Sequence, residues 1–211
     1  MSRAGVKRRS FKPPFASTID RDRAGRFGMV LFLATLAVLF VATIVGYVVI
    51  RYQLGLREAW PEGLPGPPGG LGISTIVLLL SSGTIHLASL RARADRRSGA
   101  KTWILATFAL GALFLVMQAA AWRAWTLEAM PRWDGSEAFR FALAGFYIVT
   151  GLHAAHVVGG LVFLVWTAVR LAGGRPMVDV APLVIYAAMY WHFLDVVWLT
   201  IYALLFLGPL G

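Results

Sequence analysis

One segment near the carboxyl end of the chain carries the residues best suited to chemistry. Residues 190–198 read YWHFLDVVW and lie within a long apolar run, in which Asp195 is the one carboxylate. On a helix, Trp191, Asp195 and Trp198 share one face and His192 lies beside it. A carboxyl group is costly in hydrocarbon, so this face should point at protein or water. The pattern predicts either a polar face that docks one helix on another or a proton-relay or ligand site.

All four histidines lie in apolar runs, at His86, His153, His156 and His192. His153 and His156 are three residues apart, close enough on a helix to share a metal, and His192 is a candidate axial haem ligand. Ligand histidines of stacked haems usually come in matched pairs on two helices, however, and here no second acidic residue completes a metal set. The spacing therefore favours histidines that are hydrogen-bonded at helix interfaces over a haem or metal site.

Composition indicates an integral membrane protein. The 211 residues are 58% hydrophobic and 14% charged, and the mean hydropathy is +0.70. The absence of cysteine excludes disulfides, thiolate metal sites and covalent c-type haem. The net charge of +10 comes from basic residues grouped beside apolar runs, which is typical of membrane orientation and argues against a nucleic-acid partner.

Five apolar runs each approach the roughly 20 residues that cross a bilayer. They cover residues 27–50, 71–90, 102–122, 141–169 and 182–207. We expect an all-α bundle of five transmembrane helices in a domain of residues 27–211, preceded by a basic cytoplasmic tail of residues 1–26. A segment rich in proline and glycine at residues 61–70 should form the first loop.

Charge alternates between the two sides of this arrangement. The tail and the second and fourth connections hold eight, five and two basic residues, whereas the intervening loops hold five in all. The positive-inside rule then places the N-terminus in the cytoplasm and the C-terminus on the periplasmic side.

Small and weakly polar residues follow one face of the second, third and fourth runs. Gln118 and Gly111 share such a face in the third run, and His153 and Gly160 do so in the fourth. Faces of this kind allow helices to pack in lipid, where apolar contact alone gives no preference. The first run contains only two threonines, Thr35 and Thr43, and should have the largest contact with lipid.

Two of these segments resemble motifs of subunit III of the haem–copper terminal oxidases, the cytochrome c oxidase subunit III family. Residues 145–160, GFYIVTGLHAAHVVGG, are similar to the signature T-G-x-H-x-x-H-V-x-x-G, and residues 190–198 to YWHFVDVVW. Shorter matches, in the same order as in the family, are residues 26–29, RFGM, and residues 79–83, LLSSG. Five spans match the short bacterial form of the family, which lacks two leading helices.

The resemblance implies a cofactor-free accessory subunit, with haem and copper in the partner subunits. Such a chain is a multi-pass protein of the bacterial inner membrane that packs beside the catalytic subunit I, with subunit II in the same complex, and holds structural phospholipid in a cleft. The complex oxidises cytochrome c, reduces oxygen to water and pumps protons. The resemblance implies no catalytic or metal-binding residue here, and a structural role for the buried polar residues His86, Gln118, His153, His156, Trp191, His192, Asp195 and Trp198.

The chain also departs from the family pattern. Leu36 stands where the family usually has an intramembrane glutamate, and Ala121 and Ile185 stand at two further positions where an acid is common. These departures favour a mainly structural role. Two alternatives remain close to this reading, namely subunit III of a quinol oxidase and a homologue associated with nitric oxide reductase. An independent membrane haem protein or transporter is a remote alternative.

Overall fold

The computed structural model describes residues 18–57, 65–66, 68–133 and 135–207. It contains five long helices and one short 3₁₀ turn, η1 (Met130–Arg132). The helices are α1 (Thr18–Arg57), α2 (Gly70–Arg93), α3 (Arg97–Ala129), α4 (Glu137–Ala172) and α5 (Met177–Leu207). All five are long and apolar enough to cross a membrane, and each contains one of the predicted runs. The described residues confirm the prediction of an all-α protein with five helices apolar enough to span a membrane.

The helices extend beyond the apolar runs, most clearly at the start of the chain. α1 begins at Thr18, nine residues before the predicted run, so its first turns include part of the segment predicted as a tail. Within them Arg26 forms an ion pair with Asp22 at 3.0 Å, one turn earlier, which is a spacing that supports a helix. Residues 1–17 of the predicted tail and residues 61–64 and 67 of the predicted loop at 61–70 lie outside the described residues.

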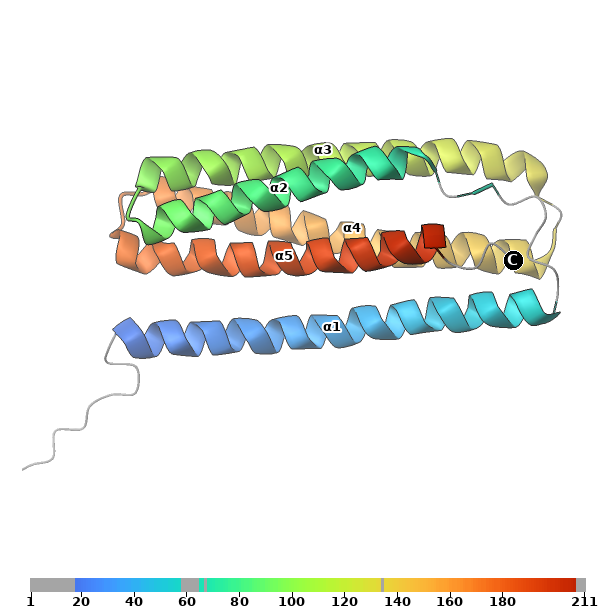
Figure 1. The fold of residues 1–211 in the computed structure, drawn as a ribbon, viewed down its shortest axis with the longest axis horizontal. Helices are drawn as coiled ribbons and strands as arrows, with labels where there is room; N and C mark the ends of the chain where they lie inside the picture. The colour runs from blue at the N-terminus through green and yellow to red at the C-terminus, as the bar shows by residue number, and fades with distance from the viewer. Residues whose placement is uncertain (1–17, 58–64, 67, 134, 208–211) are drawn as a thin grey trace, which may run out of the picture.

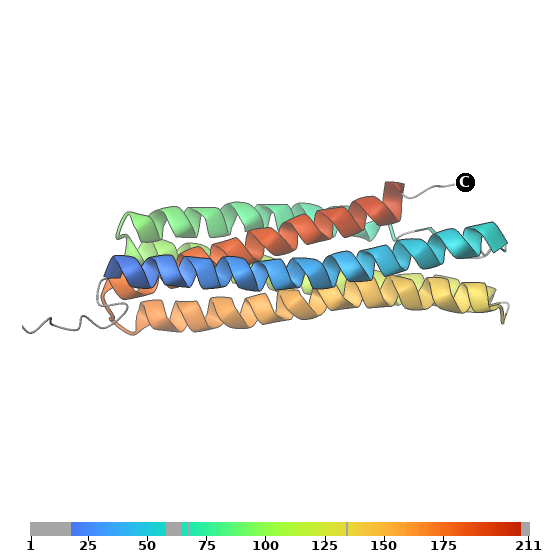
Figure 2. The ribbon, with the colours of Figure 1, turned by 90° about the horizontal axis from the view of Figure 1, so that it is seen from below.

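Four of the helices close into a ring, and the fifth lies against its outside. α2 packs on α3, α3 on α4, α4 on α5 and α5 back on α2, whereas α1 packs on α4 and α5. Figure 1 shows α1 running along the α5 side of the other four helices, and the turned view in Figure 2 shows it lying over both α4 and α5. This arrangement leaves most of α1 exposed, as the sparse polar content of its sequence predicted.

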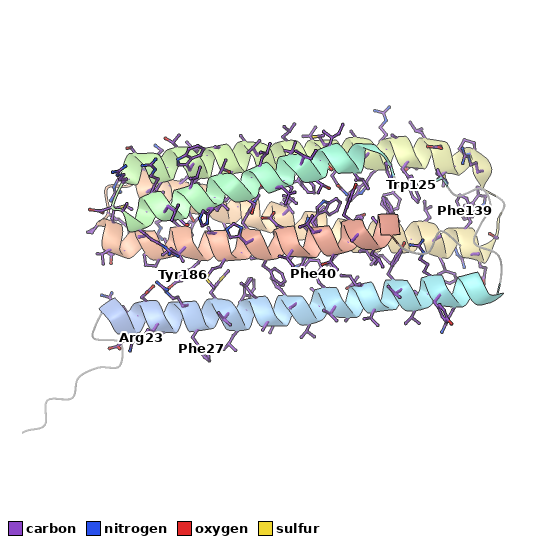
Figure 3. All side chains as sticks on the ribbon, in the orientation of Figure 1. Arg23, Phe27, Phe40, Trp125, Phe139 and Tyr186 are labelled. Atoms are coloured by element: carbon purple, nitrogen blue, oxygen red, sulfur yellow. The ribbon has the colours of Figure 1, made fainter. Side chains whose placement is uncertain are left out.

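The interior of the ring contains large aromatic side chains among aliphatic ones. Trp191 and Trp198 of α5 and Phe114 of α3 are all almost fully buried. Figure 3 shows side chains filling the space between the helices. From α1, Phe40 reaches this core and its ring lies 5.0 Å from that of His156.

Side chains also tie the helix ends together. The Arg97 guanidinium at the start of α3 donates to the carbonyl of Leu171 at 2.7 Å, in the last turn of α4, and to that of Arg175 in the connection to α5. At the opposite end of the bundle, the indole of Trp125 donates to the carbonyls of Pro65 and Gly66, both at 3.1 Å.

Candidate functional site

The segment YWHFLDVVW of α5 makes hydrogen bonds to α2 of the same chain. The Trp191 indole N–H donates to Ser81 Oγ, and the Trp198 N–H donates to Thr75 Oγ1, each at 2.9 Å. Both hydroxyls donate in turn to carbonyls one turn earlier in α2. Each hydroxyl therefore has one donor and one acceptor role, and both tryptophans are satisfied without a ligand. Two hydrogen bonds on this face therefore hold α5 against α2.

Asp195 lies on this face but is not held in the same way. Its side chain is only 6% exposed, and neither carboxyl oxygen has a hydrogen-bond partner among the described residues. The nearest basic group is Nδ1 of His192, 3.7 Å away. That nitrogen also lies 2.8 Å from Ser82 Oγ, with which it shares a hydrogen bond. The carboxyl group is thus enclosed by packing, with His192 as its polar neighbour.

The pair His153 and His156, which the spacing raised as a shared metal site, diverges in the structure. His153 lies inside the ring, with its imidazole 5.0 Å from the Trp198 ring and 6.0 Å from the Phe114 ring. His156 packs against Phe40 of α1, and its Nδ1 bonds the carbonyl of Leu152 at 2.8 Å. The described part of the chain holds no group of three or more histidine, aspartate or glutamate side chains close enough to bind a metal ion.

His156 and His192 make hydrogen bonds of the kind the spacing favoured, whereas His86 and His153 make none with the described residues. Neither ring nitrogen of His153 has a hydrogen-bond partner among the described residues. The physical reason is its neighbourhood, because the aromatic rings on either side offer contact area without acceptors. Gln118 of α3 is similarly buried, and its amide has no described partner.

The remaining candidate residues lie on several helices and differ in burial. His86 is exposed on α2, and its ring lies 6.2 Å from that of His192. Leu36 is partly buried and packs from α1 against the core, so this position faces protein. Ala121 is buried on α3, and Ile185 lines a hollow at the beginning of α5.

Two glycines lie close against the Trp191 ring, which the sequence did not predict. A Cβ atom at Gly111 of α3 would lie 2.7 Å from the Trp191 ring, and one at Gly160 of α4 would lie 3.0 Å from it. Both glycines were recognised as packing positions. The sequence carried no signal that they face the same tryptophan, because helix pairing was not visible in it.

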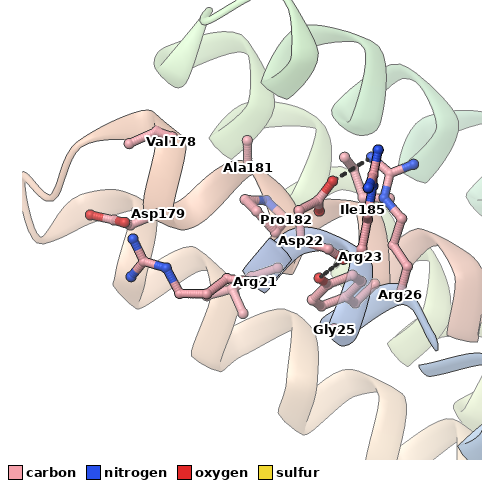
Figure 4. Close-up of a pocket in the computed structure, with 12 residues that line it drawn as sticks. Arg21, Asp22, Arg23, Gly25, Arg26, Val178, Asp179, Ala181, Pro182 and Ile185 are labelled. Atoms are coloured by element: carbon pink, nitrogen blue, oxygen red, sulfur yellow. Dashed lines mark hydrogen bonds and ion pairs between the residues drawn. The ribbon is translucent and has the colours of Figure 1, made fainter. Parts of the chain in front are cut away.

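An open hollow of about 770 Å³ lies between the first turns of α1 and α5. Figure 4 shows arginines of α1 on one side of it and mostly apolar residues of α5 on the other. The arginines are Arg21, Arg23 and Arg26, and Asp22 accepts the ion pair from Arg26. Sequence reasoning assigned these arginines to the tail and did not predict the hollow.

The enclosure of Asp195 leads to a prediction about its shape and charge. Asp195→Asn should assemble nearly normally because asparagine keeps the size and hydrogen-bonding capacity of the side chain, whereas Asp195→Leu should weaken the packing of α5. The expected loss is about 1–3 kcal/mol, because a leucine of different shape overpacks the enclosed site. Thermal unfolding of the purified complex measures it, with oxygen consumption followed in parallel. A variant Asp195→Asn that assembles well but has lost turnover would show that the negative charge itself is used.

Comparison with known proteins agrees with this architecture. The family model described as cytochrome c oxidase subunit III matches residues 16–208, which include all five helices. Cytochrome c oxidase subunit 3 of Thermostichus vulcanus is 30% identical over 85% of each chain. A probable cytochrome c oxidase subunit 3 of Mycobacterium tuberculosis is 27% identical over 90% of each chain. Subunit 3 of the cytochrome bo(3) ubiquinol oxidase of Pseudomonas aeruginosa is 28% identical over 86% of this chain and 83% of its own. The chain therefore belongs to the cytochrome c oxidase subunit III family of the haem–copper oxidases.

Proposed function

We propose that this chain is the accessory subunit III of a respiratory haem–copper terminal oxidase, and that it stabilises the catalytic subunit without taking part in electron transfer. The observation that carries the proposal is the family match, which runs through all five helices. The geometry of the YWHFLDVVW segment supports a structural role, because its two tryptophans are hydrogen-bonded to hydroxyls of α2.

Membership of this family implies association with other oxidase subunits. The family has no metal centres of its own, so electron transfer and oxygen chemistry belong to the subunits beside it. We infer that the partners are the catalytic subunit I and subunit II, which carry the haem and copper. Leu36 in place of the family glutamate favours packing over proton uptake as the contribution of this chain.

The electron donor is proposed to be cytochrome c, with quinol as the second candidate. Two of the relatives compared above are named as cytochrome c oxidase subunits, and the third is named as a subunit of a ubiquinol oxidase. Purification through a tag on this chain should bring down a haem-containing catalytic subunit, and the chain alone should show no Soret band and no stoichiometric copper. Oxygen uptake with reduced cytochrome c against ubiquinol then identifies the donor. Purification of the chain without any oxidase subunit would overturn the proposal.

Phospholipid is proposed to occupy the hollow between the first turns of α1 and α5. Three arginines stand near apolar side chains of α5 such as Leu183 and Ile185, which suits a phosphate headgroup above an acyl chain. Tyr186 of α5 closes one wall, and α1 can approach it because Gly25 has no Cβ; a Cβ there would clash with the phenol oxygen.

We propose that the chain lies in the bacterial inner membrane with its N-terminus in the cytoplasm. The support is the uneven distribution of basic residues, which include Arg93, Arg96 and Arg97 at the α2–α3 turn.

This orientation predicts the labelling of single cysteines, which the cysteine-free chain allows. Arg96 and Glu137 are exposed at opposite ends of the bundle, so Arg96→Cys and Glu137→Cys should react with an impermeant maleimide from opposite sides. In intact spheroplasts only Glu137→Cys should be labelled, and permeabilisation should expose Arg96→Cys. Labelling of Arg96→Cys alone in intact spheroplasts would reverse the orientation.

A further inference from the structure

The outer surface of α2 and α5 carries two histidines at a depth where lipid would be expected. His86 is exposed and lies seven residues before Arg93, about 10 Å along the helix. The His192 side chain is 41% exposed and lies fifteen residues after Met177, about 22 Å along α5. Their rings are 6.2 Å apart, so the two helices present them on one surface.

These two imidazoles differ in their hydrogen bonding. Nδ1 of His192 is hydrogen-bonded to Ser82 at 2.8 Å. The His86 imidazole makes no hydrogen bond with the described residues, and its ring lies beside that of His192. A neutral imidazole has one donor and one acceptor, and leaving both in hydrocarbon is costly. The exposed imidazole of His86 is therefore available to bond a polar group from outside this chain.

Threonines exposed on other helix surfaces do not create this requirement. Thr35 and Thr43 of α1 donate to carbonyls of their own helix, at 2.7 and 2.9 Å, and Thr200 of α5 does the same at 2.9 Å. A hydroxyl bonded in this way can face lipid, since its donor is satisfied. His86 makes no such bond among the described residues, unlike His156, whose Nδ1 bonds the carbonyl of Leu152 one turn earlier. Polar side chains in spans normally face protein.

The backbone beside His86 is open to a close neighbour. Gly83 lies one turn before His86, and no heavy atom lies within 4 Å of the position that its Cβ would take. Leu79, a further turn away, is 45% exposed, and Val196 of α5, one turn after His192, is 63% exposed. A glycine between exposed apolar side chains allows another helix to approach closely, as membrane helices do at small residues.

We propose that this surface, formed by Leu79, Gly83, His86, His192 and Val196 and named here the histidine face, is the contact with a transmembrane helix of a neighbouring oxidase subunit. That helix carries a hydroxyl or carboxyl group level with His86, which bonds the imidazole. The inference rests on the proposed function in one respect, namely that the neighbour is an oxidase subunit. It adds the face of the bundle that is used and the chemistry that recognises it.

Two glycine substitutions provide a matched test in the complete complex. Gly83→Leu places a bulky side chain on the histidine face, whereas Gly28→Leu does so on α1, where a Cβ also meets nothing within 4 Å. Gly83→Leu should lower the amount of this subunit retained on the purified oxidase by about tenfold or more, and Gly28→Leu should not. His86→Leu should lower retention in the same direction. Quantifying the subunit in membranes before purification separates lost contact from failure to fold. Full retention of Gly83→Leu, or equal losses at both glycines, would overturn the proposal.

Photocrosslinking gives an independent result that does not depend on weakened binding. A benzoylphenylalanine replacing Leu79 should crosslink to another oxidase subunit, and one replacing the exposed Leu31 of α1 should crosslink to lipid. Crosslinks from position 79 to lipid alone, or to a second copy of this chain, would overturn the proposal. If the unmodified chain does not purify with an oxidase at all, the proposed function fails; if it does but position 79 finds no subunit, only the histidine face is wrong.

Discussion

Replacing Gly111 with leucine is expected to prevent the bundle from closing around Trp191 and to remove most of the folded subunit from the membrane. A Cβ atom at Gly111 would lie 2.7 Å from two atoms of the indole ring and 3.1 Å from the side chain of Leu161. The ring cannot retreat toward α4, because the Gly160 backbone approaches it from that side. Trp191 is also anchored by its hydrogen bond to Ser81. Overpacking of this kind costs about 1–3 kcal/mol for small insertions, and leucine adds four carbons.

The sign of the effect makes Gly111 a sharp test. In a helix, leucine is favoured over glycine by about 0.8 kcal/mol, so the same change at an open position should be neutral or stabilising. Gly28→Leu is that control, since no atom lies near its Cβ. Thermal unfolding of the purified subunit in detergent should rank Gly28→Leu at or above the unmodified chain, Gly111→Ala below it and Gly111→Leu lowest. Partial recovery in a Gly111→Leu, Trp191→Leu double variant would assign the loss to the clash. Equal stability of the two glycine-to-leucine variants would contradict the packing described.

The number and order of the helices could be predicted from the sequence because each span must satisfy its own backbone in lipid. Each span is therefore a single helix of about 20 mostly apolar residues, and such a run is visible in the sequence whatever the helix packs against. The helix ends could not be placed in the same way. α1 starts within charged residues such as Arg23, where the apolar signal is absent and local pairs such as Asp22–Arg26 support the helix.

Helix pairing was the information that the sequence lacked. The period of α5 placed Trp191 and Trp198 on one buried face, as the structure shows. Nothing in the period could indicate that their partners are Ser81 and Thr75 of α2, since many weakly polar residues occupy helix faces in this chain. The sequence could not predict, for the same reason, that His153 lies inside the ring and His156 packs against α1. Three residues on a helix turn a side chain far enough to meet different neighbours, and only the packed bundle shows which ones.

Replacing Trp198 with alanine is expected to be the most damaging single truncation on α5. The side chain is fully buried, its ring lies 5.2 Å from Phe114 and 5.0 Å from His153, and its N–H is bonded to Thr75. Truncating a buried tryptophan to alanine costs about 3–5 kcal/mol, because the cavity left behind does not fully collapse. The aromatic contacts with α3 and α4 and the hydrogen bond to α2 would be lost together.

Two further variants separate the ring contacts of Trp198 from its hydrogen bond. Trp198→Phe keeps an aromatic ring but removes the indole N–H, and Thr75→Val keeps the tryptophan but leaves that N–H without its acceptor. Each should cost about 0.6–2 kcal/mol, less than Trp198→Ala, if ring packing supplies most of the stabilisation. Thermal unfolding of the three variants in one detergent gives the ranking, and the Phe variant combined with Thr75→Val measures the coupling directly. Because both partners are absent in that double variant, its loss should fall below the sum of the single losses. A Phe variant as unstable as the alanine variant would instead show that the hydrogen bond between α5 and α2, and not the aromatic packing with α3 and α4, holds this part of the bundle together.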